Sequence, residues 1–348
     1  MIRWINNLKG FGILLVVLGH LLPREEFGKW IYSFHLPLFF YISGYLYSIK
    51  PQGAQTVWGG VKKAFIRLMC PFYFWSYLCL LINFVVAVIW CQEQVNLLVR
   101  YTVRVTLGGG QNGLRDLGLS LFPLWFIPPL FCTKVLLIIV RQYIKKESVR
   151  IILLLSLSVI GVCLFYFDIH IPYLPYRLDV AFISIPFVLL GVYHNKLYKK
   201  LKRPSVGLIL VCIGTISSII NSRLSPIGTI EIVDYQISNP FLFYFSAINL
   251  CSGFFILFET IIKESSVSEF FGNNSMIVMA FHFPILFWIQ HVLSIDFFSQ
   301  FLFVCVILCV VILLINRFIP FTFDFRLIIE NENSYYSRRT GYSYRFRK

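Results

Sequence analysis

The stretch from Asn6 to Tyr47, NNLKGFGILLVVLGHLLPREEFGKWIYSFHLPLFFYISGYLY, decides how the rest of the chain folds. It contains two apolar runs, residues 11–22 and 30–49, joined by a short charged segment. Each run contains one histidine: His20 lies near the end of the first run, and His35 near the start of the second. If the two runs cross a bilayer as a hairpin, both imidazoles lie at about the same depth.

Lys9 and His20 occupy one face of the first predicted helix. Eleven residues separate their positions, which corresponds to three helical turns plus roughly 20° and a rise of about 16 Å. The lysine therefore lies at one membrane surface and the histidine near the other. A cation and an ionisable imidazole on one face suit a path through the membrane.

The composition indicates that a lipid bilayer surrounds most of this protein. Hydrophobic residues make up 58% of the chain and charged residues only 14%, against about 25% charged in ordinary soluble domains. So few charged side chains cannot cover so much apolar surface in water. We expect the net charge of +15 to come from cytoplasmic loops rather than to indicate a nucleic-acid partner. The nine cysteines form no CxxC or Cys/His cluster, so we expect no metal.

Hydropathy predicts an all-α integral membrane protein with about ten transmembrane helices and no soluble domain. We expect the transmembrane domain to cover residues 1–320. A basic, Tyr-rich cytoplasmic tail follows over residues 321–348, and we expect it to contact anionic lipid headgroups. The predicted spans are about 6–22, 30–49, 68–90, 119–140, 150–168, 177–193, 205–221, 239–261, 274–292 and 297–317.

The loop charges predict that both termini are cytoplasmic (N-in/C-in). With ten alternating spans and a cytoplasmic N-terminus, 23 of the 31 Lys and Arg residues fall on cytoplasmic segments and 7 on outer ones. The remaining one, Lys134, lies within a span. This asymmetry is the positive-inside pattern.

Ionisable side chains inside the spans are the first functional candidates, because burying them in a membrane is costly. They are His20, His35, Lys134 and His282. Each histidine can be either a structural hydrogen-bonding residue or a general base, a role that suits an unperturbed pKa of about 6.5. Two histidines at matched depth and a third in the ninth span favour the functional interpretation. We expect the other histidines to be surface residues near loops, namely His170, His194 and His291.

Basic residues cluster just before the third predicted span, on the same side as Lys9. Lys62 and Lys63 are consistent with ordinary positive-inside charge. Arg67, directly against the start of the span, suits bidentate binding of a phosphate on an anionic cytoplasmic donor. Elsewhere, Lys134 can simply snorkel toward the membrane surface. Arg177 can pair with Asp179 or contact a polar acceptor.

Six segments occur in an order that is typical of one family: WINNLKGFGILLVVLGH, SFHLPLFFYISGYLY, RLMCPFYFW, PLWFIPPLF, FVLLGVYHNK and SMIVMAFHFPI. Together they resemble the membrane-bound acyltransferase-3 family, particularly its fucose 4-O-acetylase-like branch. The resemblance covers essentially the whole chain and is most specific over the first fifty or so residues. It implies about ten helices and the transfer of acyl groups, usually acetyl from acetyl-CoA, onto sugars of surface glycans.

The resemblance also assigns roles to residues. The family has a basic residue, ten others and then a histidine in its first helix, and Lys9 and His20 match this pattern. His35 matches the histidine of the family's FHxPLFF segment, and Arg67 matches its arginine before the third helix. The family often has an acidic residue where this chain has Asn6, which supplies only a neutral hydrogen bond and indicates altered donor handling or lower activity.

These observations predict a membrane O-acetyltransferase of the bacterial inner membrane that acts on a surface polysaccharide or its lipid-linked precursor. Its donor, acetyl-CoA, would be bound from the cytoplasm by Lys9 and Arg67, with Lys62 or Lys63. His20 and His35 would be catalytic, one acting as general base or carrying the acetyl group transiently. The outer depth of the histidines favours acceptor access from the outer face. Further site candidates are Asn6, Ser43, Trp125, Lys134, Arg177 and His282.

Two alternatives remain open. A glycan flippase or small-molecule transporter would use the intramembrane histidines as a substrate or proton path, although no matching pair of Gly/Pro-broken helices indicates an inverted repeat. A polysaccharide polymerase also has many helices, but its chemistry does not need the Lys9–His20 face. Release of free CoA in the presence of acceptor separates the acyltransferase from both.

Overall fold

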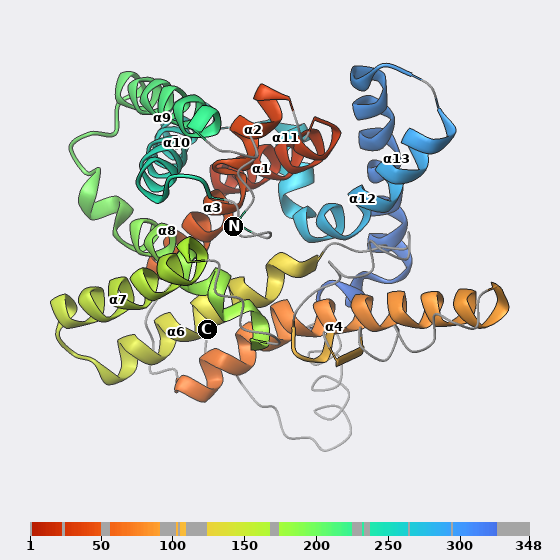
Figure 1. Ribbon diagram of the computed structural model, residues 1–348, viewed down its shortest axis with the longest axis horizontal. Helices are drawn as coiled ribbons and strands as arrows, with labels where there is room; N and C mark the ends of the chain where they lie inside the picture. The colour runs from red at the N-terminus through yellow and green to blue at the C-terminus, as the bar shows by residue number, and fades with distance from the viewer. Residues whose placement is uncertain are drawn as a thin grey trace, which may run out of the picture.

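The computed structural model describes residues 2–22, 25–49, 56–90, 102–103, 105–108, 124–167, 174–224, 232, 237–263, 265–293 and 295–325. The elements in these segments are all helical (Figure 1). The predictions for His170 and for most of the tail fall outside the described residues. The α-helices are α1 (Arg3–Leu21), α2 (Glu26–Tyr32), α3 (His35–Ser48), α4 (Val57–Trp90), α6 (Ile127–Tyr143), α7 (Glu147–Tyr166), α8 (Leu178–Leu197), α9 (Pro204–Leu224), α10 (Pro240–Thr260), α11 (Ser266–Asn273), α12 (Ser275–Val292) and α13 (Phe297–Phe318). Short 3-10 helices are η3 (Leu124–Phe126), η4 (Pro175–Arg177) and η5 (Pro320–Thr322).

The helices have the length and composition of membrane spans. Within the described segments, eight are long and apolar enough to cross a bilayer, and a ninth candidate is the pair α11–α12, bent by 87°. The windows of α7 and α13 reach mean hydropathies of 2.4 and 3.0 with only 22% of their residues buried. Apolar faces turned outward are favourable only when lipid is the solvent. The protein is therefore a polytopic integral membrane protein, as predicted.

The second predicted span is not one helix, so the prediction of an unbroken run over 30–49 is wrong. Helix α2 ends at Tyr32, and α3 begins at His35. The Ser33 hydroxyl donates a hydrogen bond of 2.7 Å to the Trp30 carbonyl, which lies in the last turn of α2. Helix α3 has 14 residues and is about 21 Å long, shorter than a hydrocarbon core of about 30 Å. The break places the His35 side chain at the start of a helix.

The third span begins earlier than predicted. Helix α4 starts at Val57 and has 34 residues, so Lys62, Lys63 and Arg67 lie within it rather than before it. Pro71 lies inside this helix, where it removes one backbone donor. Arg67 is thus presented from a helix face, one turn before that proline.

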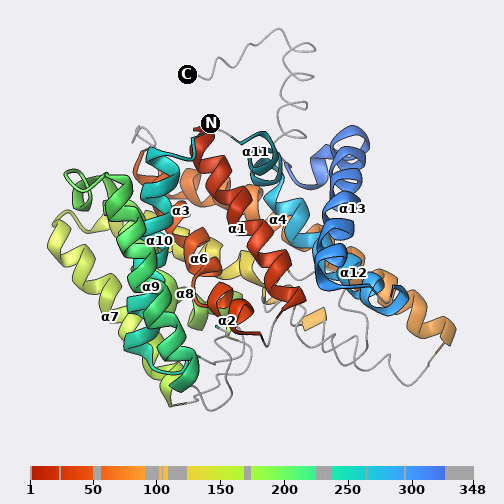
Figure 2. The ribbon, with the colours of Figure 1, turned by 90° about the horizontal axis from the view of Figure 1, so that it is seen from above.

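Helix α1 is the central element that positions the site. Figure 2 shows it near the middle of the molecule, between α10 on one side and α12 on the other, and it contacts both. Its first half packs against α11 with backbone almost touching backbone. A Cβ atom at Gly10 would lie 1.7 Å from the Ser268 carbonyl oxygen, and one at Gly272 would lie 1.8 Å from the Asn6 carbonyl oxygen. Only glycine permits this approach.

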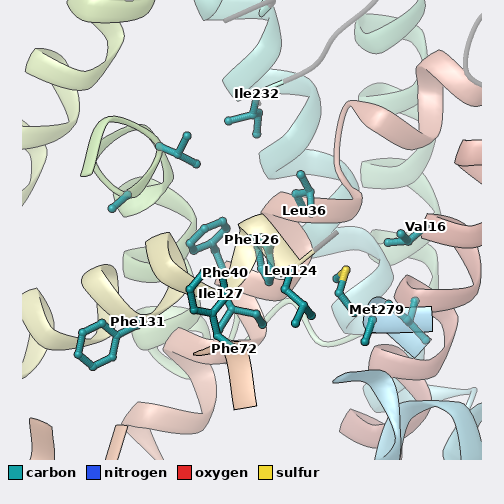
Figure 3. Close-up of a cluster of buried hydrophobic side chains, with 14 of the residues drawn as sticks. Val16, Leu36, Phe40, Phe72, Leu124, Phe126, Ile127, Phe131, Ile232 and Met279 are labelled. Atoms are coloured by element: carbon teal, nitrogen blue, oxygen red, sulfur yellow. The ribbon is translucent and has the colours of Figure 1, made fainter. Parts of the chain in front are cut away.

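Helix α3 is held by close contact with α8 and by buried aromatic side chains. A Cβ at Gly44 would lie 2.0 Å from the Val188 carbonyl oxygen, so α3 and α8 are in close backbone contact. One helical turn earlier, Phe40 meets Phe126 of η3 with ring centroids 5.0 Å apart, beside Phe72 of α4 (Figure 3). These contacts fix α3, and with it His35, in the bundle.

The first turn of α1 and the last turn of α13 lie at the same end of the bundle. Asn6 is in contact with Gly272 at the end of α11. Two residues further on, the side-chain oxygen of Asn274 accepts a hydrogen bond from the Asn316 amide of α13 at 2.9 Å. We call this end the Lys9 end; the sequence predicts that it is cytoplasmic.

Candidate active site

Three histidines from different helices meet at the end of the bundle opposite Lys9. His20 comes from the last turn of α1, His35 starts α3, and His282 lies in the middle of α12. The ring centroids of His20 and His282 are 5.1 Å apart, and His35 lies near His282. Tyr32 lies between His20 and His35, with ring centroids 5.9 Å and 5.1 Å from theirs. These four residues form what we call the histidine cluster.

Backbone carbonyls orient the two buried rings. His35 Nδ1 donates to the Ile31 carbonyl at 2.8 Å, and His282 Nδ1 donates to the Val278 carbonyl at 2.9 Å. In a neutral ring, this bond places the proton on Nδ1 and leaves a lone pair on Nε2. Both rings are therefore set up to accept a proton. The sequence does not reveal which groups orient the rings, because main-chain carbonyls have no residue signature.

His282 has the clearest functional signature in the cluster. Its side chain is fully buried, and its Nε2 atom has no hydrogen-bond partner in the part of the chain that the structure describes. A buried polar atom without a partner costs about 1–3 kcal/mol. Such an atom needs an explanation, and binding or catalysis is one.

His20 is the most accessible ring of the three. It is half-buried, whereas His35 and His282 are buried. Its Nδ1 is hydrogen-bonded to the Tyr32 hydroxyl at 3.1 Å, and Phe283 meets the ring edge-on at 5.6 Å between centroids. A polar molecule that enters the cluster from outside therefore reaches His20 first.

At the other end of α1, two of the four predicted donor-binding cations come together. Lys9 and Arg67 are half-buried, and their positive charges act on each other. Lys62 and Lys63 are exposed on α4. Half-burial and mutual proximity distinguish Lys9 and Arg67 from the two exposed lysines.

The remaining candidates lie outside the histidine cluster and apart from Lys9 and Arg67. Asn6 is buried beneath α11, and its side-chain oxygen has no hydrogen-bond partner among the described residues. Ser43, Trp125 and Lys134 are half-buried on α3, η3 and α6.

Arg177 and Asp179 pair with each other, which is one of the two predicted alternatives. The Arg177 guanidinium donates to both carboxylate oxygens of Asp179 at 3.0–3.2 Å. The preceding backbone is strained, because Tyr176 and Arg177 have φ of 57° and 51°, a left-handed conformation that non-glycine residues rarely adopt. The ion pair holds this corner at the start of α8.

The prediction that His194 is a surface residue is wrong. Its side chain is fully buried where α8 packs against α3 and α10, and its Nδ1 is hydrogen-bonded to the Tyr41 hydroxyl at 2.7 Å. Its Nε2 lies 3.5 Å from a carboxylate oxygen of Glu259, whose other oxygen accepts from Lys202. The sequence contains a signal for this network, because Glu259 is an acidic residue within an otherwise apolar predicted span.

Among the described residues, no three His, Cys, Asp or Glu side chains are placed to hold a metal ion.

Comparison with known proteins gives a family match. The family model of an acyltransferase domain, Acyl_transf_3, matches residues 2–317. No curated protein and no solved structure gives a significant match. The matched region includes the three histidines, Lys9 and Arg67.

Proposed function

Because the chain belongs to the acyltransferase-3 family, we propose that it transfers an acetyl group from acetyl-CoA to a sugar hydroxyl. It is a multi-pass membrane acyltransferase. The proposal adds the donor, the acceptor and the location: a surface polysaccharide or its lipid-linked precursor, at the bacterial inner membrane, as in the fucose 4-O-acetylase-like branch. The sequence segments that resemble this branch support these additions.

The observation that carries the proposal is the meeting of three imidazoles, two of them with their Nδ1 protons fixed on backbone carbonyls. An acceptor hydroxyl is a weak nucleophile and needs a base as it attacks a thioester. Imidazole is suited to this role near neutral pH, and a positioned base contributes about 10²–10⁴-fold to the rate. The Nε2 lone pairs of His35 and His282 would act as this base.

The proposed reaction proceeds in two steps. The acceptor hydroxyl passes its proton to an Nε2 atom of the cluster while its oxygen bonds to the acetyl carbonyl carbon. The carbon–sulfur bond of the tetrahedral intermediate then breaks, and the CoA thiolate takes the proton from the imidazolium and leaves as the thiol. His20, the most exposed ring, contacts the acceptor. Transient transfer of the acetyl group to a histidine is the alternative order of events.

Lys9 and Arg67 would bind the donor phosphates at the other end of α1. The rise from Lys9 to His20 is about 16 Å, a distance that an extended pantetheine arm can cover. Arginine binds phosphate with two parallel hydrogen bonds, and lysine acts as a point charge. A cytoplasmic donor and an outer acceptor would then meet at the histidine cluster.

The test measures glycan O-acetylation in a deletion strain that expresses wild type or one of three single variants, His20→Gln, His35→Gln and His282→Gln. Arg317→Gln, at an exposed position in the last turn of α13, is the matched control, and membrane abundance is equalised by immunoblot. We expect acetyl esters with wild type and the control, and a loss of about 100-fold or more in the histidine variants. Esters that persist in the deletion strain, with defective glycan export, would refute the proposal in favour of a transporter.

A further inference from the structure

A cavity of about 300 Å³ lies between the ends of α3, α6, α7 and α8, away from the histidine cluster. Its floor is apolar and includes the buried side chains of Leu137, Leu154 and Leu189. Its mouth is polar and carries two arginines, Arg141 in the last turn of α6 and Arg150 in the first turn of α7. We call it the arginine cavity.

The guanidinium of Arg150 has hydrogen-bonding capacity left over. Its Nη2 donates to the Lys145 carbonyl at 3.1 Å. Its Nε is buried and has no hydrogen-bond partner among the residues that the structure describes. A buried donor of a charged group without an acceptor is costly, so a rotation of the Arg150 side chain that turns its N–H groups toward an anion in the cavity would be favourable.

The second guanidinium is held beside the first. Arg141 lies over the ring of Tyr47, with its central carbon 5.6 Å from the ring centroid. This cation–π contact and a hydrogen bond with the Tyr47 hydroxyl orient the group, and a guanidinium has five N–H donors, so more than one Arg141 donor can still reach a ligand. The one carboxylate among the lining residues, Glu147, is 3.5 Å from Lys196. The cavity therefore keeps a positive charge.

The position of the cavity indicates from which side of the membrane a ligand would enter it. The C-terminal end of α3 contributes Tyr47 and Ser48 to the lining, and α3 runs from the histidine cluster toward the Lys9 end. From His35 to Tyr47 the helix rises about 18 Å. The cavity thus opens at the end predicted to be cytoplasmic, where phosphate is carried by anionic lipid headgroups and by nucleotides.

We propose that the arginine cavity binds a phosphate group, carried either by an anionic phospholipid or by a soluble nucleotide-type molecule. Two guanidinium groups around one anion give the parallel N–H to oxygen bonds that phosphate prefers. The apolar floor accommodates the non-phosphate part of the ligand. The proposal does not depend on acyl transfer and is tested by binding alone.

The experiment uses the purified full-length protein in neutral detergent and two phosphate probes. One is adenosine 3′,5′-bisphosphate; the other is phosphatidylglycerol in mixed micelles, compared with phosphatidylcholine. We expect at least one probe to bind, and we expect Arg150→Gln and Arg141→Gln each to weaken that binding about tenfold. Arg317→Gln, outside the cavity, should bind as wild type does. Binding of the bisphosphate alone identifies a nucleotide-type ligand, and binding of phosphatidylglycerol alone identifies a lipid.

A variant that binds the probe more tightly than wild type cannot be explained by misfolding. Glu147→Gln removes the negative charge from the lining and frees Lys196, so it should bind the same probe several-fold more tightly than wild type. The proposal is overturned if neither probe binds wild type at millimolar concentration, or if the double variant R141Q/R150Q binds as wild type does. Unchanged or weaker binding by Glu147→Gln overturns it as well.

Discussion

Replacing His194 by phenylalanine should destabilise the protein even though an aromatic ring is retained. The imidazole lies between Tyr41 and Glu259 and packs on Phe255, with ring centroids 4.3 Å apart. Phenylalanine keeps an aromatic ring at this position and removes both nitrogens. The Tyr41 hydroxyl then retains only a long contact with Ser252 at 3.4 Å.

The expected cost follows from the two lost contacts. Leaving a buried hydroxyl poorly satisfied costs about 1–3 kcal/mol, and the remaining Ser252 contact favours the low end. The 3.5 Å contact with Glu259 is long, and the carboxylate keeps Lys202, so its loss adds about 1 kcal/mol. Together, His194→Phe should lower the free energy of unfolding by about 2–3 kcal/mol. Tyr41→Phe removes the other partner, so the double variant should cost less than the sum of the two single variants by about 1 kcal/mol.

The assay is reversible unfolding in mixed micelles, followed by tryptophan fluorescence, for wild type, both single variants and the double variant. Tyr143→Phe, at a tyrosine that is 74% exposed, is the matched control and should unfold as wild type does. The reasoning fails if His194→Phe is as stable as wild type. It also fails if the effects of the two single variants simply add, because the Tyr41–His194 bond would then contribute nothing.

Three further outcomes are expected. Tyr32→Phe removes the hydroxyl that is hydrogen-bonded to His20 and should lower kcat about tenfold with little change in KM. The assay is CoA release by the purified protein with acceptor, and a changed KM with unchanged kcat would contradict this positioning role. Arg67→Gln should raise the KM for acetyl-CoA about tenfold while kcat stays within twofold or so, and an unchanged KM in the same assay would remove Arg67 from the donor site. Gly272→Val should abolish folded protein in detergent by size-exclusion chromatography, because its Cβ would lie 1.8 Å from a carbonyl oxygen of α1; a monodisperse variant would show that α11 can move away.

The sequence predicts the membrane fold well, because the length and apolarity of a span are local properties. The helices α1, α9, α10 and α13 lie close to the predicted spans. The break between α2 and α3 was not predictable from hydropathy, which measures an apolar run and not its continuity. The local signal for the break is Pro37 in the first turn of α3, which has no N–H to bond the Ser33 carbonyl and whose ring would clash with that carbonyl in a continuous helix.

The candidate site was predictable in part. The matched depths of His20 and His35 follow from two adjacent apolar runs. The arrival of His282 beside them depends on how α12 packs against α1, a contact between residues more than 250 positions apart. The burial of His194 has the same origin, because the end of α8 lies beside α10 only in the folded bundle. Sequence periodicity describes the faces of a helix and not the neighbours of those faces.

The carbonyl anchors of His35 and His282 have a consequence for how this protein tolerates mutation. An orienting carboxylate can be lost through one codon change, whereas the carbonyls of Ile31 and Val278 belong to every residue type that could replace them. Side chains at these two positions are therefore free to vary without loss of ring orientation. The vulnerable property is chain length: inserting or deleting one residue in α12 between Val278 and His282 rotates the ring by about 100° around the helix. Libraries of point substitutions would miss this dependence, and libraries of single-residue insertions and deletions would reveal it.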